Sequence, residues 1–351
     1  MAKSDQSQRS VLVMRLSALG DVAMTIPVLY PACRANPGTR FVMLTKKWPA
    51  SMFHDRPDNL EVLGIDVKKE YKGVIGLIRL ALKLRRKYDI DAVADLHNVL
   101  RTRVMGIVFR LCGIPVVRLD KERAQRKALI THKTDQPVTP TIDRYRLVFK
   151  NLGLEAPNDF TRLYDGKPLP VSPIVLEKGP GQRWIAVSPF SAHEGKIYPL
   201  KLMEQVVELL SQHENYWIFL MGGGKEEKIA LRGLVKRHRH VTSMAEIKHG
   251  FIDEYALFGK CDLMLTMDSA NMHLASLMDL KSVTIWGATA PACGFLGYGQ
   301  DASTDIQLDM ECRPCSIYGE RECRYGDYRC MARVSPEAIA AHVVNLLEGR
   351  Q

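Results

Sequence analysis

The chain has 351 residues, too many for one ordinary core, so we expect two domains. Its composition, 46% hydrophobic and 25% charged, is typical of a soluble globular protein. No apolar run reaches the roughly 18 residues that a membrane-spanning helix needs, so we expect no such helix. Residues 1–10 lack the apolar segment of a secretory signal, so we expect a disordered tail and a cytoplasmic location.

The net charge of +10 is concentrated in the first half of the chain. Residues 68–87 carry eight Lys or Arg against one Glu, and residues 101–133 carry nine against two acidic residues, so each segment is +7. This excess favours a polyanionic partner: nucleic acid, an anionic membrane surface or an acidic glycolipid. A solvated basic surface is the ordinary alternative. No signature of a nucleic-acid-binding fold supports the first of these partners, so we expect no nucleic acid.

The first half alternates short apolar runs with amphipathic segments, which predicts a doubly wound α/β domain. The expected strands are Val11–Met14, Arg40–Thr45, Leu60–Ile65, Asp91–Leu96 and Pro115–Leu119. The expected helices are Val22–Ala35, Val74–Tyr88, Val99–Cys112, Lys121–Lys133 and Thr141–Leu152. Pro27 and Pro31 should kink or shorten the first of these helices.

Polar residues follow two of these strands. Asp21 comes after the first strand and a glycine turn, and His97 comes directly after the fourth strand. In a parallel sheet such ends meet at one edge, where ligands bind. Arg101 and Arg103 fall in the first turn of the next helix, where cations oppose the helix dipole, which suggests that they serve a ligand. The glycine content of the first loop is too low for a dinucleotide fingerprint or a P-loop.

Residues 155–181 are rich in Pro and Gly without a clear period, and we place a linker at 161–181. A second sheet begins at Trp184–Pro189. Ser191 and Lys196 follow it and precede a helix that starts with proline. Backbone N–H groups, a hydroxyl and a lysine at a helix N-terminus suit a diphosphate, although an ordinary surface loop fits equally well.

Further along the chain, two carboxylates also follow predicted strands. Glu226 follows the turn Gly222–Gly224, where it suits ribose hydroxyls or simply the dipole of the next helix. Residues 262–291 read as strand, turn, helix, turn and strand. Asp268 ends the first of these strands, and His273 lies one turn into the helix. We expect Asp268 to face a ligand crevice, with a helix cap as the alternative.

Four of these segments resemble, in the right order, the motifs of glycosyltransferase family 9, the bacterial lipopolysaccharide heptosyltransferases. The loop Arg15-Leu-Ser-Ala-Leu-Gly-Asp21 resembles the N-terminal motif of that family. The later segments are Lys196-Ile-Tyr-Pro199, Gly222-Gly-Gly-Lys-Glu226 and Asp268-Ser-Ala-Asn-Met-His273. They resemble the family patterns Lys-x-Trp-Pro, Gly-x-x-x-Glu and Asp-Thr-Gly-x-x-His.

The resemblance implies a GT-B fold, with two Rossmann-like, doubly wound parallel-sheet domains facing across a cleft. It places an N-terminal acceptor-binding domain at 11–160 and a C-terminal nucleotide-sugar-binding domain at 182–334. The C-terminal helix, 335–351, is expected to pack back on the N-terminal domain.

The resemblance also implies an inverting transferase that moves heptose from ADP-heptose to an anionic inner-core acceptor with Kdo or heptose on lipid A. Such an enzyme would work peripherally at the cytoplasmic face of the inner membrane, with no cofactor for catalysis. By resemblance the catalytic base is Asp21, and the donor-binding residues are Ser191, Lys196, Glu226, Asp268 and His273, with a buried structural role as the alternative for His273. The acceptor is expected to bind the first domain at the strand–helix junction that carries His97, Arg101 and Arg103. Lys196 would face the diphosphate, Glu226 the ribose and Asp268 the sugar.

Three departures from the family patterns leave the transferred sugar open: Tyr198, Ser269 and Ala270 replace Trp, Thr and Gly. Two alternatives are therefore a transferase that uses another ADP-sugar and a non-catalytic binder of nucleotide sugars or glycolipids. Asp21 favours an enzyme, because a binder needs no base at that position. A nicotinamide dehydrogenase is disfavoured, since no G-x-G-x-x-G follows a strand.

Half of the eight cysteines fall in one loop, with the spacing Cys312-x₂-Cys315-x₇-Cys323-x₆-Cys330. A Cys-x₂-Cys pair is the usual half of a tetrahedral zinc site, but the second half has wider spacing than a zinc ribbon. In a reducing cytoplasm such clustering favours metal over disulfides. Structural zinc, two disulfides and free thiols remain open for this loop.

Overall fold

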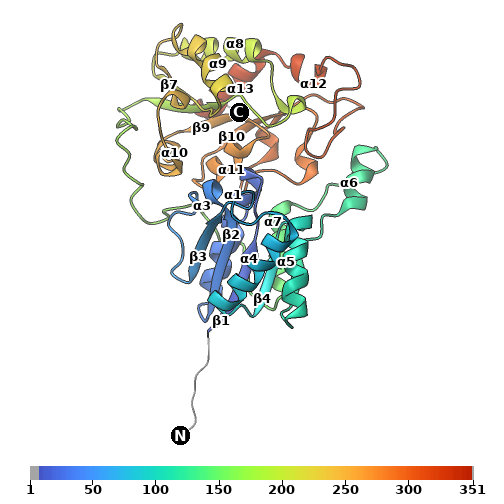
Figure 1. Cartoon of the computed structure of the whole chain (residues 1–351). Coiled ribbons are helices and arrows are strands. Elements are labelled where there is room, and N and C mark those ends of the chain that lie inside the picture. The colour runs from blue at the N-terminus through green and yellow to red at the C-terminus, as the bar shows by residue number, and fades with distance from the viewer. Residues whose placement is uncertain (1–7, 350–351) are drawn as a thin grey trace. The chain divides into compact units, whose positions relative to one another are not determined.

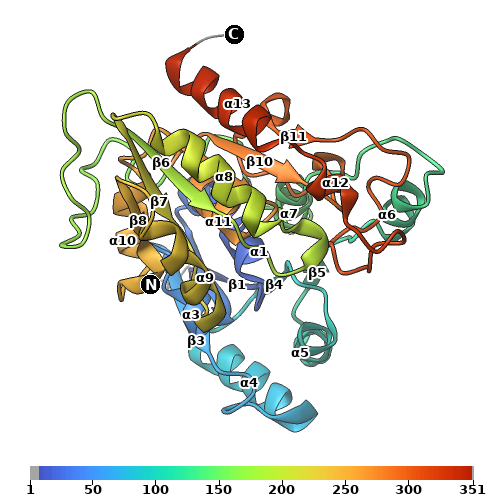
Figure 2. The same cartoon turned by 90° about the horizontal axis from the view of Figure 1, so that it is seen from above.

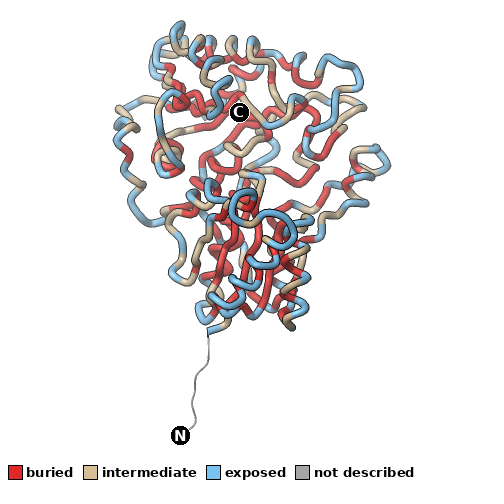
Figure 3. Tube along the Cα trace, viewed as in Figure 1, coloured by how far each residue is buried: buried red, intermediate tan, exposed pale blue. Residues whose placement is uncertain are grey.

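A computed structural model describes residues 8–349 and divides into two compact units (Figure 1). Unit 1 consists of Met1–Lys121 and Thr141–Leu163, and unit 2 consists of Glu122–Pro140 and Tyr164–Gln351. Each unit has its own parallel sheet, as the alternation of strands and helices predicts. Figure 3 shows the buried strands at the centre of each unit. Every helix within residues 8–349 is too short or too polar to span a bilayer.

Unit 1 is built on a five-stranded sheet with the order β3-β2-β1-β4-β5, in which all neighbours are parallel. Its strands are β1 (Arg9–Met14), β2 (Thr39–Lys46), β3 (Leu60–Ile65), β4 (Ala92–Asp95) and β5 (Val116–Arg118). Strands β1 and β4 lie side by side, although β2 and β3 separate them in the sequence. Their carboxyl ends form a topological switch point, the place where open α/β sheets bind ligands.

The helices of unit 1 are α1 (Leu19–Ala23), α2 (Ile26–Ala35), α3 (Lys47–Ala50), α4 (Gly73–Tyr88), α5 (Leu100–Leu111) and α7 (Thr141–Lys150). The expected helix Val22–Ala35 is in fact two helices. The chain breaks after Ala23, and Pro27 takes the second position of α2, where its missing N–H costs nothing. Helices α4 and α5 pack against each other and share one apolar core with the sheet.

The expected disordered tail, residues 1–10, lies largely outside the described residues, which begin at residue 8. Arg9 and Ser10 correct this expectation, because both belong to β1. The Arg9 guanidinium donates to the carbonyl of Leu152 at 2.8 Å, and the Ser10 N–H donates to the Asp91 carboxylate at 2.7 Å. These partners hold the start of the strand in place.

Unit 2 is built on a six-stranded parallel sheet with the order β11-β10-β9-β6-β7-β8. Its strands are β6 (Arg183–Ser188), β7 (Tyr216–Leu220), β8 (Val241–Ser243), β9 (Leu263–Met267), β10 (Ser282–Trp286) and β11 (Ile306–Gln307). The order reverses between β6 and β9, so their carboxyl ends form the switch point of this unit. Short β8 was not expected from the sequence.

The helices of unit 2 are α6 (Arg123–Ile130), α8 (Leu200–Ser211), α9 (Lys225–Val235), α10 (Phe251–Phe258), α11 (Ala270–Ser276), α12 (Arg329–Ala332) and α13 (Pro336–Glu348). Short 3-10 turns cover Glu194–Lys196, Met244–Glu246, Pro291–Cys293 and Ala302–Thr304. The sequence predicts α8, α9, α11 and α13, whereas α12 is not expected from it.

The last helix, α13, belongs to unit 2, and the expectation that 335–351 packs on the first domain stays a prediction. Helix α13 lies beside α8 (Figure 2). It buries Ile339, Val343 and Leu347 in the apolar core of unit 2. These side chains share that core with Met203, Val207 and Leu210 of α8.

Residues 122–140 also depart from the expected first domain, 11–160, because they belong to unit 2. Arg126 of α6 is buried, and its guanidinium lies 5.5 Å and 5.4 Å from the ring centres of Phe295 and Tyr318. It also donates a hydrogen bond to the Tyr318 hydroxyl, 192 positions away in the sequence. The local periodicity of a sequence gives no sign of a contact between residues so far apart in the chain.

The expected linker, 161–181, contains no helix or strand, but it belongs to unit 2 from Tyr164 onwards. The Lys178 ammonium lies 2.6 Å from the Asp262 carboxylate. This ion pair ties the segment to the loop before β9.

Candidate functional site

In unit 1 an arginine from the loop after β1 and an aspartate from the short helix α1 form a close ion pair. Nη2 of Arg15 lies 2.6 Å from Oδ2 of Asp21, and the same oxygen accepts the backbone N–H of Ala18 at 3.1 Å. Arg15 is buried, and its Nη1 donates to the carbonyl of Leu96 at 2.8 Å. The Asp21 side chain keeps 21% of its surface exposed. The loop after β1 therefore fixes the direction of this carboxylate and leaves it open to a ligand.

His97 follows β4 and lies beside this pair, as the parallel arrangement of β1 and β4 predicts. Its Nδ1 accepts the backbone N–H of Leu16 at 3.4 Å. Burial, reinforced by the positive charge of Arg15, lowers the pKa of His97 to about 3. The imidazole is therefore neutral near pH 7, and Nε2 carries its proton because Nδ1 is the acceptor.

Arg101 and Arg103 lie exposed in the first turn of α5. Nε of Arg103 donates to Oδ1 of Asn98 at 2.8 Å, and the Asn98 amide donates in turn to the carbonyl of Leu119 at 2.8 Å. The structure thus brings His97 together with Asp21, and it anchors Arg103 at the junction that follows β4.

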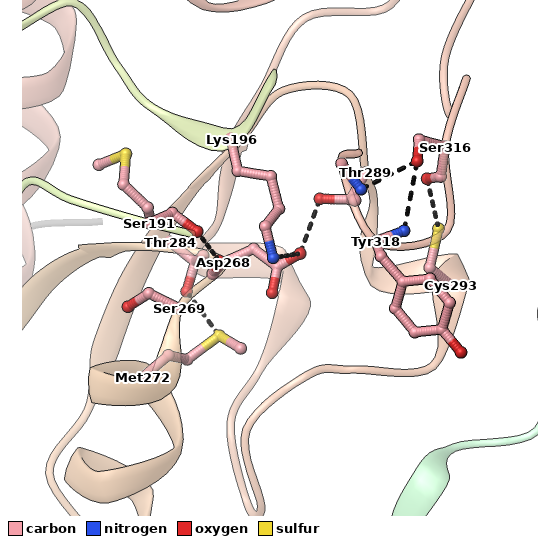
Figure 4. A network of polar contacts seen from close by, with 12 residues as sticks. Ser191, Lys196, Asp268, Ser269, Met272, Thr284, Thr289, Cys293, Ser316 and Tyr318 are labelled. Carbon is pink, nitrogen blue, oxygen red and sulfur yellow. Dashed lines mark hydrogen bonds and ion pairs between the residues drawn. The ribbon is translucent and has the colours of Figure 1, made fainter. Parts of the chain in front are cut away.

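In unit 2 the Asp268 carboxylate is the centre of a buried polar network at the carboxyl end of β9 (Figure 4). Its Oδ2 lies 3.3 Å from Nζ of Lys196 and accepts the hydroxyl of Thr289 at 2.8 Å. The Ser191 hydroxyl donates to the Asp268 carbonyl at 2.7 Å. Side-chain exposure is only 7% for Asp268 and 12% for Lys196.

The position of Asp268 excludes its alternative role as a helix cap. The N-cap of α11 is Ser269, and no side chain makes a capping hydrogen bond there. The Asp268 side chain is instead directed to a lysine from the loop after β6 and a threonine from the loop after β10. The network therefore joins three loops at the switch point of unit 2.

Lys196 is held in place by close packing of neighbouring loops. The Ala288 N–H donates to the carbonyl of Gly195 at 2.8 Å. Gly319 has φ +82°, and a Cβ at this position would lie 2.5 Å from Cγ of Lys196. Glycine is required at 319 both by its backbone conformation and by this contact. The cysteine-rich segment, which contains Gly319, therefore packs directly on the lysine.

Glu226 and His273, also predicted for the donor site, lie on different helices of unit 2 and differ in burial. Glu226 is exposed in the first turn of α9, whereas the Glu227 carboxylate closes the preceding turn by accepting the N–H of Gly223 at 2.7 Å. His273 is buried in α11, one turn beyond Asp268. The turn-closing role thus belongs to Glu227 and leaves the Glu226 carboxylate at the surface.

Sequence reasoning did not assign a role to Arg15 or Thr289, although each carries a signal. Arg15 directly follows a buried strand, and arginine is almost never buried without a partner. Thr289 follows β10, the neighbour of β9. Residues that follow adjacent parallel strands meet at one edge of the sheet, so Thr289 could have been expected beside Asp268. The departure at Tyr198 has a structural explanation: its ring is buried, and its hydroxyl donates to the carbonyl of Val334 at 2.7 Å.

The four clustered cysteines, Cys312, Cys315, Cys323 and Cys330, line one pocket of about 250 Å³. No disulfide joins any of the eight cysteines. Burial raises the pKa of Cys323, but backbone N–H groups of residues 325–328 outweigh it, and the net effect is a lowered pKa. Between residues 8 and 349, no three His, Cys, Asp or Glu side chains are arranged to hold a metal ion. The cysteines as placed therefore do not fit a tetrahedral metal centre.

Comparison with known proteins gives consistent matches over nearly the whole chain. The sequence model of glycosyltransferase family 9 (heptosyltransferase) matches residues 77–327. Lipopolysaccharide heptosyltransferase 1 of Pseudomonas aeruginosa is 23% identical over 373 residues, which cover 96% of this chain and 98% of the relative.

Two solved structures are also similar to this chain. A family 9 glycosyl transferase from Veillonella parvula aligns with a TM-score of 0.72 at 18% identity, covering 97% of this chain and 98% of that chain. E. coli heptosyltransferase WaaC with ADP aligns with a TM-score of 0.68 at 17% identity, covering 96% and 99%. At these identities the structural likeness establishes a shared fold.

We expect His97 to make the protein less stable as pH falls. Its pKa is about 3 in the folded chain against an ordinary 6.5, so below pH 6.5 only the unfolded chain gains the proton. The folding free energy should then weaken by up to about 1.4 kcal/mol per pH unit. In urea unfolding, the free energy of unfolding of the His97→Gln variant should fall less steeply than that of the wild type between about pH 6.5 and pH 4.5. Exposed His240→Gln is the control, and equal slopes in all three proteins would refute the assignment.

Proposed function

Because the chain belongs to glycosyltransferase family 9, the heptosyltransferase family, we propose that it transfers heptose from ADP-heptose to an anionic lipopolysaccharide inner-core acceptor. It is a glycosyltransferase with the GT-B fold of two parallel-sheet α/β units. An adenine nucleotide donor is supported by the E. coli relative, which was solved with ADP. A lipopolysaccharide acceptor is supported by the name of the Pseudomonas relative. That this acceptor carries Kdo or heptose on lipid A is the finer part of the proposal.

The donor diphosphate is assigned to the loop between β6 and α8. Lys196 supplies a positive charge there, Ser191 a hydroxyl and the N-terminus of α8 its unpaired N–H groups. Asp268 directs the lysine and faces the sugar hydroxyls, and the surface carboxylate of Glu226 takes the ribose. Positive charge at this loop stabilises the diphosphate most strongly as it departs, because its negative charge grows in the transition state. The chemistry therefore calls for no cofactor.

The proposed mechanism is based on the Arg15–Asp21 ion pair at the switch point of unit 1. The acceptor hydroxyl oxygen attacks the anomeric carbon while Asp21 takes its proton. The bond from that carbon to the diphosphate oxygen breaks, and ADP leaves with the electron pair, which inverts the anomeric configuration. Arg15 and the N–H of Ala18 hold the base in one direction, and the neutral imidazole of His97 adds no competing charge.

The anionic acceptor is assigned to the basic edge of unit 1, beside His97, Arg101 and Arg103. Its lipid part lies in a membrane, so we assign the enzyme to the cytoplasmic face of the inner membrane as a peripheral protein. A transferase for another ADP-sugar and a non-catalytic binder are the competing accounts. Incubation with ADP-heptose and with other ADP-sugars separates them, since the first competitor prefers a different donor and the second gives no product.

Asp21→Asn should lower turnover by about 10²–10⁴-fold, the usual cost of losing a general base. The amide keeps the shape of the side chain, so folding and ADP-heptose binding should remain close to wild type. Product formation on an inner-core acceptor, followed by mass spectrometry, measures the effect. Asp58→Asn, at an exposed position of the same unit, is the control. Turnover of Asp21→Asn near the wild-type value would remove this residue from the mechanism.

Structural zinc is a separate proposal for the four clustered cysteines. It is supported by the Cys312-x₂-Cys315 spacing and by the common pocket of the four cysteines. Because the thiols do not surround a common centre as placed, binding requires the loop to contract around the ion.

Elemental analysis of protein purified without chelator should give about one equivalent of zinc if the cysteines form a structural site. The double variant Cys312→Ser/Cys315→Ser should lose the metal, whereas Cys112→Ser should keep it. Less than about a tenth of an equivalent in the wild-type protein would rule the site out. Titration of free thiols then separates two disulfides from unmodified cysteines.

A further inference from the structure

Helices α4 and α5 of unit 1 have an unusual outer surface. Their inner faces are ordinary, because Leu77, Leu80, Met105 and Phe109 are buried in the core of the unit. A surface helix normally directs charged and polar residues to the opposite side. Here aliphatic side chains also point outward, so both faces of these helices carry apolar residues.

The outward aliphatic residues of α4 are spaced by one helical turn. Val74, Ile78 and Leu82 follow one another at four-residue intervals, with Ile75 next to the first, and all four are exposed. Ile75 is the most open of them, with 66% of its surface exposed. Residues four apart lie on one face of a helix, so these side chains form a continuous apolar stripe.

Helix α5 packs against α4 and continues this pattern. Leu100 and Leu111 are 79% and 83% exposed, and Ile107 between them is also exposed. Leu100 is the first residue of α5 and comes three positions after His97. The apolar residues of α5 therefore begin at the edge of the sheet that carries the proposed acceptor site.

The charges on the same helices have a single sign. Their exposed cations are Arg79, Lys83, Arg85, Arg86, Lys87, Arg101, Arg103 and Arg110. Neither α4 nor α5 contains an Asp or Glu. An aliphatic stripe within eight exposed cations is the composition of a helix that lies in the headgroup region of an anionic bilayer.

We propose that this α4–α5 surface, defined by the seven exposed aliphatic residues and the eight cations above, docks unit 1 on an anionic phospholipid membrane. The inference deepens the proposed function, because it assigns the surface by which the enzyme reaches a lipid-linked acceptor. A second copy of the chain does not fit, since two such surfaces repel each other. Nucleic acid fits poorly, because the exposed apolar residues are aliphatic and provide no ring for base stacking.

The test is flotation of the full chain with vesicles that lack any acceptor. Phosphatidylcholine vesicles with about 30% phosphatidylglycerol should carry the protein upward, and pure phosphatidylcholine vesicles should not. Binding should fall between about 50 mM and 500 mM salt, since the Debye length shrinks. No donor, acceptor or turnover is involved in this test. Its failure therefore leaves the transferase proposal untouched, and failure of the transferase assay leaves the membrane-docking proposal untouched.

Two triple variants separate the apolar and electrostatic contributions. Ile75→Gln/Ile78→Gln/Leu82→Gln and Arg79→Gln/Lys83→Gln/Arg86→Gln should each lower vesicle binding by at least about tenfold. The matched controls are the exposed unit 2 residues Val171→Gln/Leu176→Gln and Lys236→Gln/Arg239→Gln/Lys248→Gln, which should bind as wild type.

Thermal unfolding confirms that each variant is folded before it is compared. Wild-type binding by both α4 variants would overturn the proposal, and so would an equal loss in the controls. Failure of the wild-type chain to float would also overturn it, and tight binding of a labelled DNA duplex would then assign the cations to nucleic acid.

Discussion

The buried carboxylate of Asp268 is the constraint on which the arrangement of unit 2 depends. A carboxylate out of water costs several kcal/mol unless charge and hydrogen bonds compensate it. Lys196 and Thr289 supply both, and they come from the loops after β6 and β10. Because the three side chains must meet, the three loops at the switch point are tied together. The close approach of Gly319 to Lys196 extends this restraint to the cysteine-rich segment.

Unit 1 also contains an ion pair, but there the cation is buried and the carboxylate is accessible. There the cation, Arg15, is inside, and its partner Asp21 reaches solvent. In unit 2 both partners are nearly enclosed. An enclosed lysine suits a site that compensates charge on a bound diphosphate, whereas an accessible carboxylate suits proton transfer from an incoming hydroxyl. The two pairs therefore divide the proposed chemistry between the two units according to their exposure.

The strands and the main helices could be predicted because their signals are local: apolar runs, helical spacing, caps and proline. The positions of Asp21, His97 and Asp268 followed as well, since parallel strands bring their carboxyl ends to one edge. What escaped prediction depends on contacts between distant segments. Burial of Arg126 between Phe295 and Tyr318, and of α13 against α8, leaves no trace in local periodicity. Roles for individual residues came from resemblance to a family, and geometry alone identified Thr289 as a partner of Asp268.

Lys196, directed by the buried Asp268 carboxylate, is the cation that we propose binds the donor diphosphate. Calorimetric titration of ADP against Lys196→Met and against Lys201→Met tests it most directly, because Lys201 is an exposed lysine in the first turn of α8. We expect a loss of affinity of at least about tenfold for Lys196→Met, the usual cost of losing a charged hydrogen bond, and wild-type affinity for Lys201→Met. Equal ADP affinity in the wild-type protein and in Lys196→Met would contradict it.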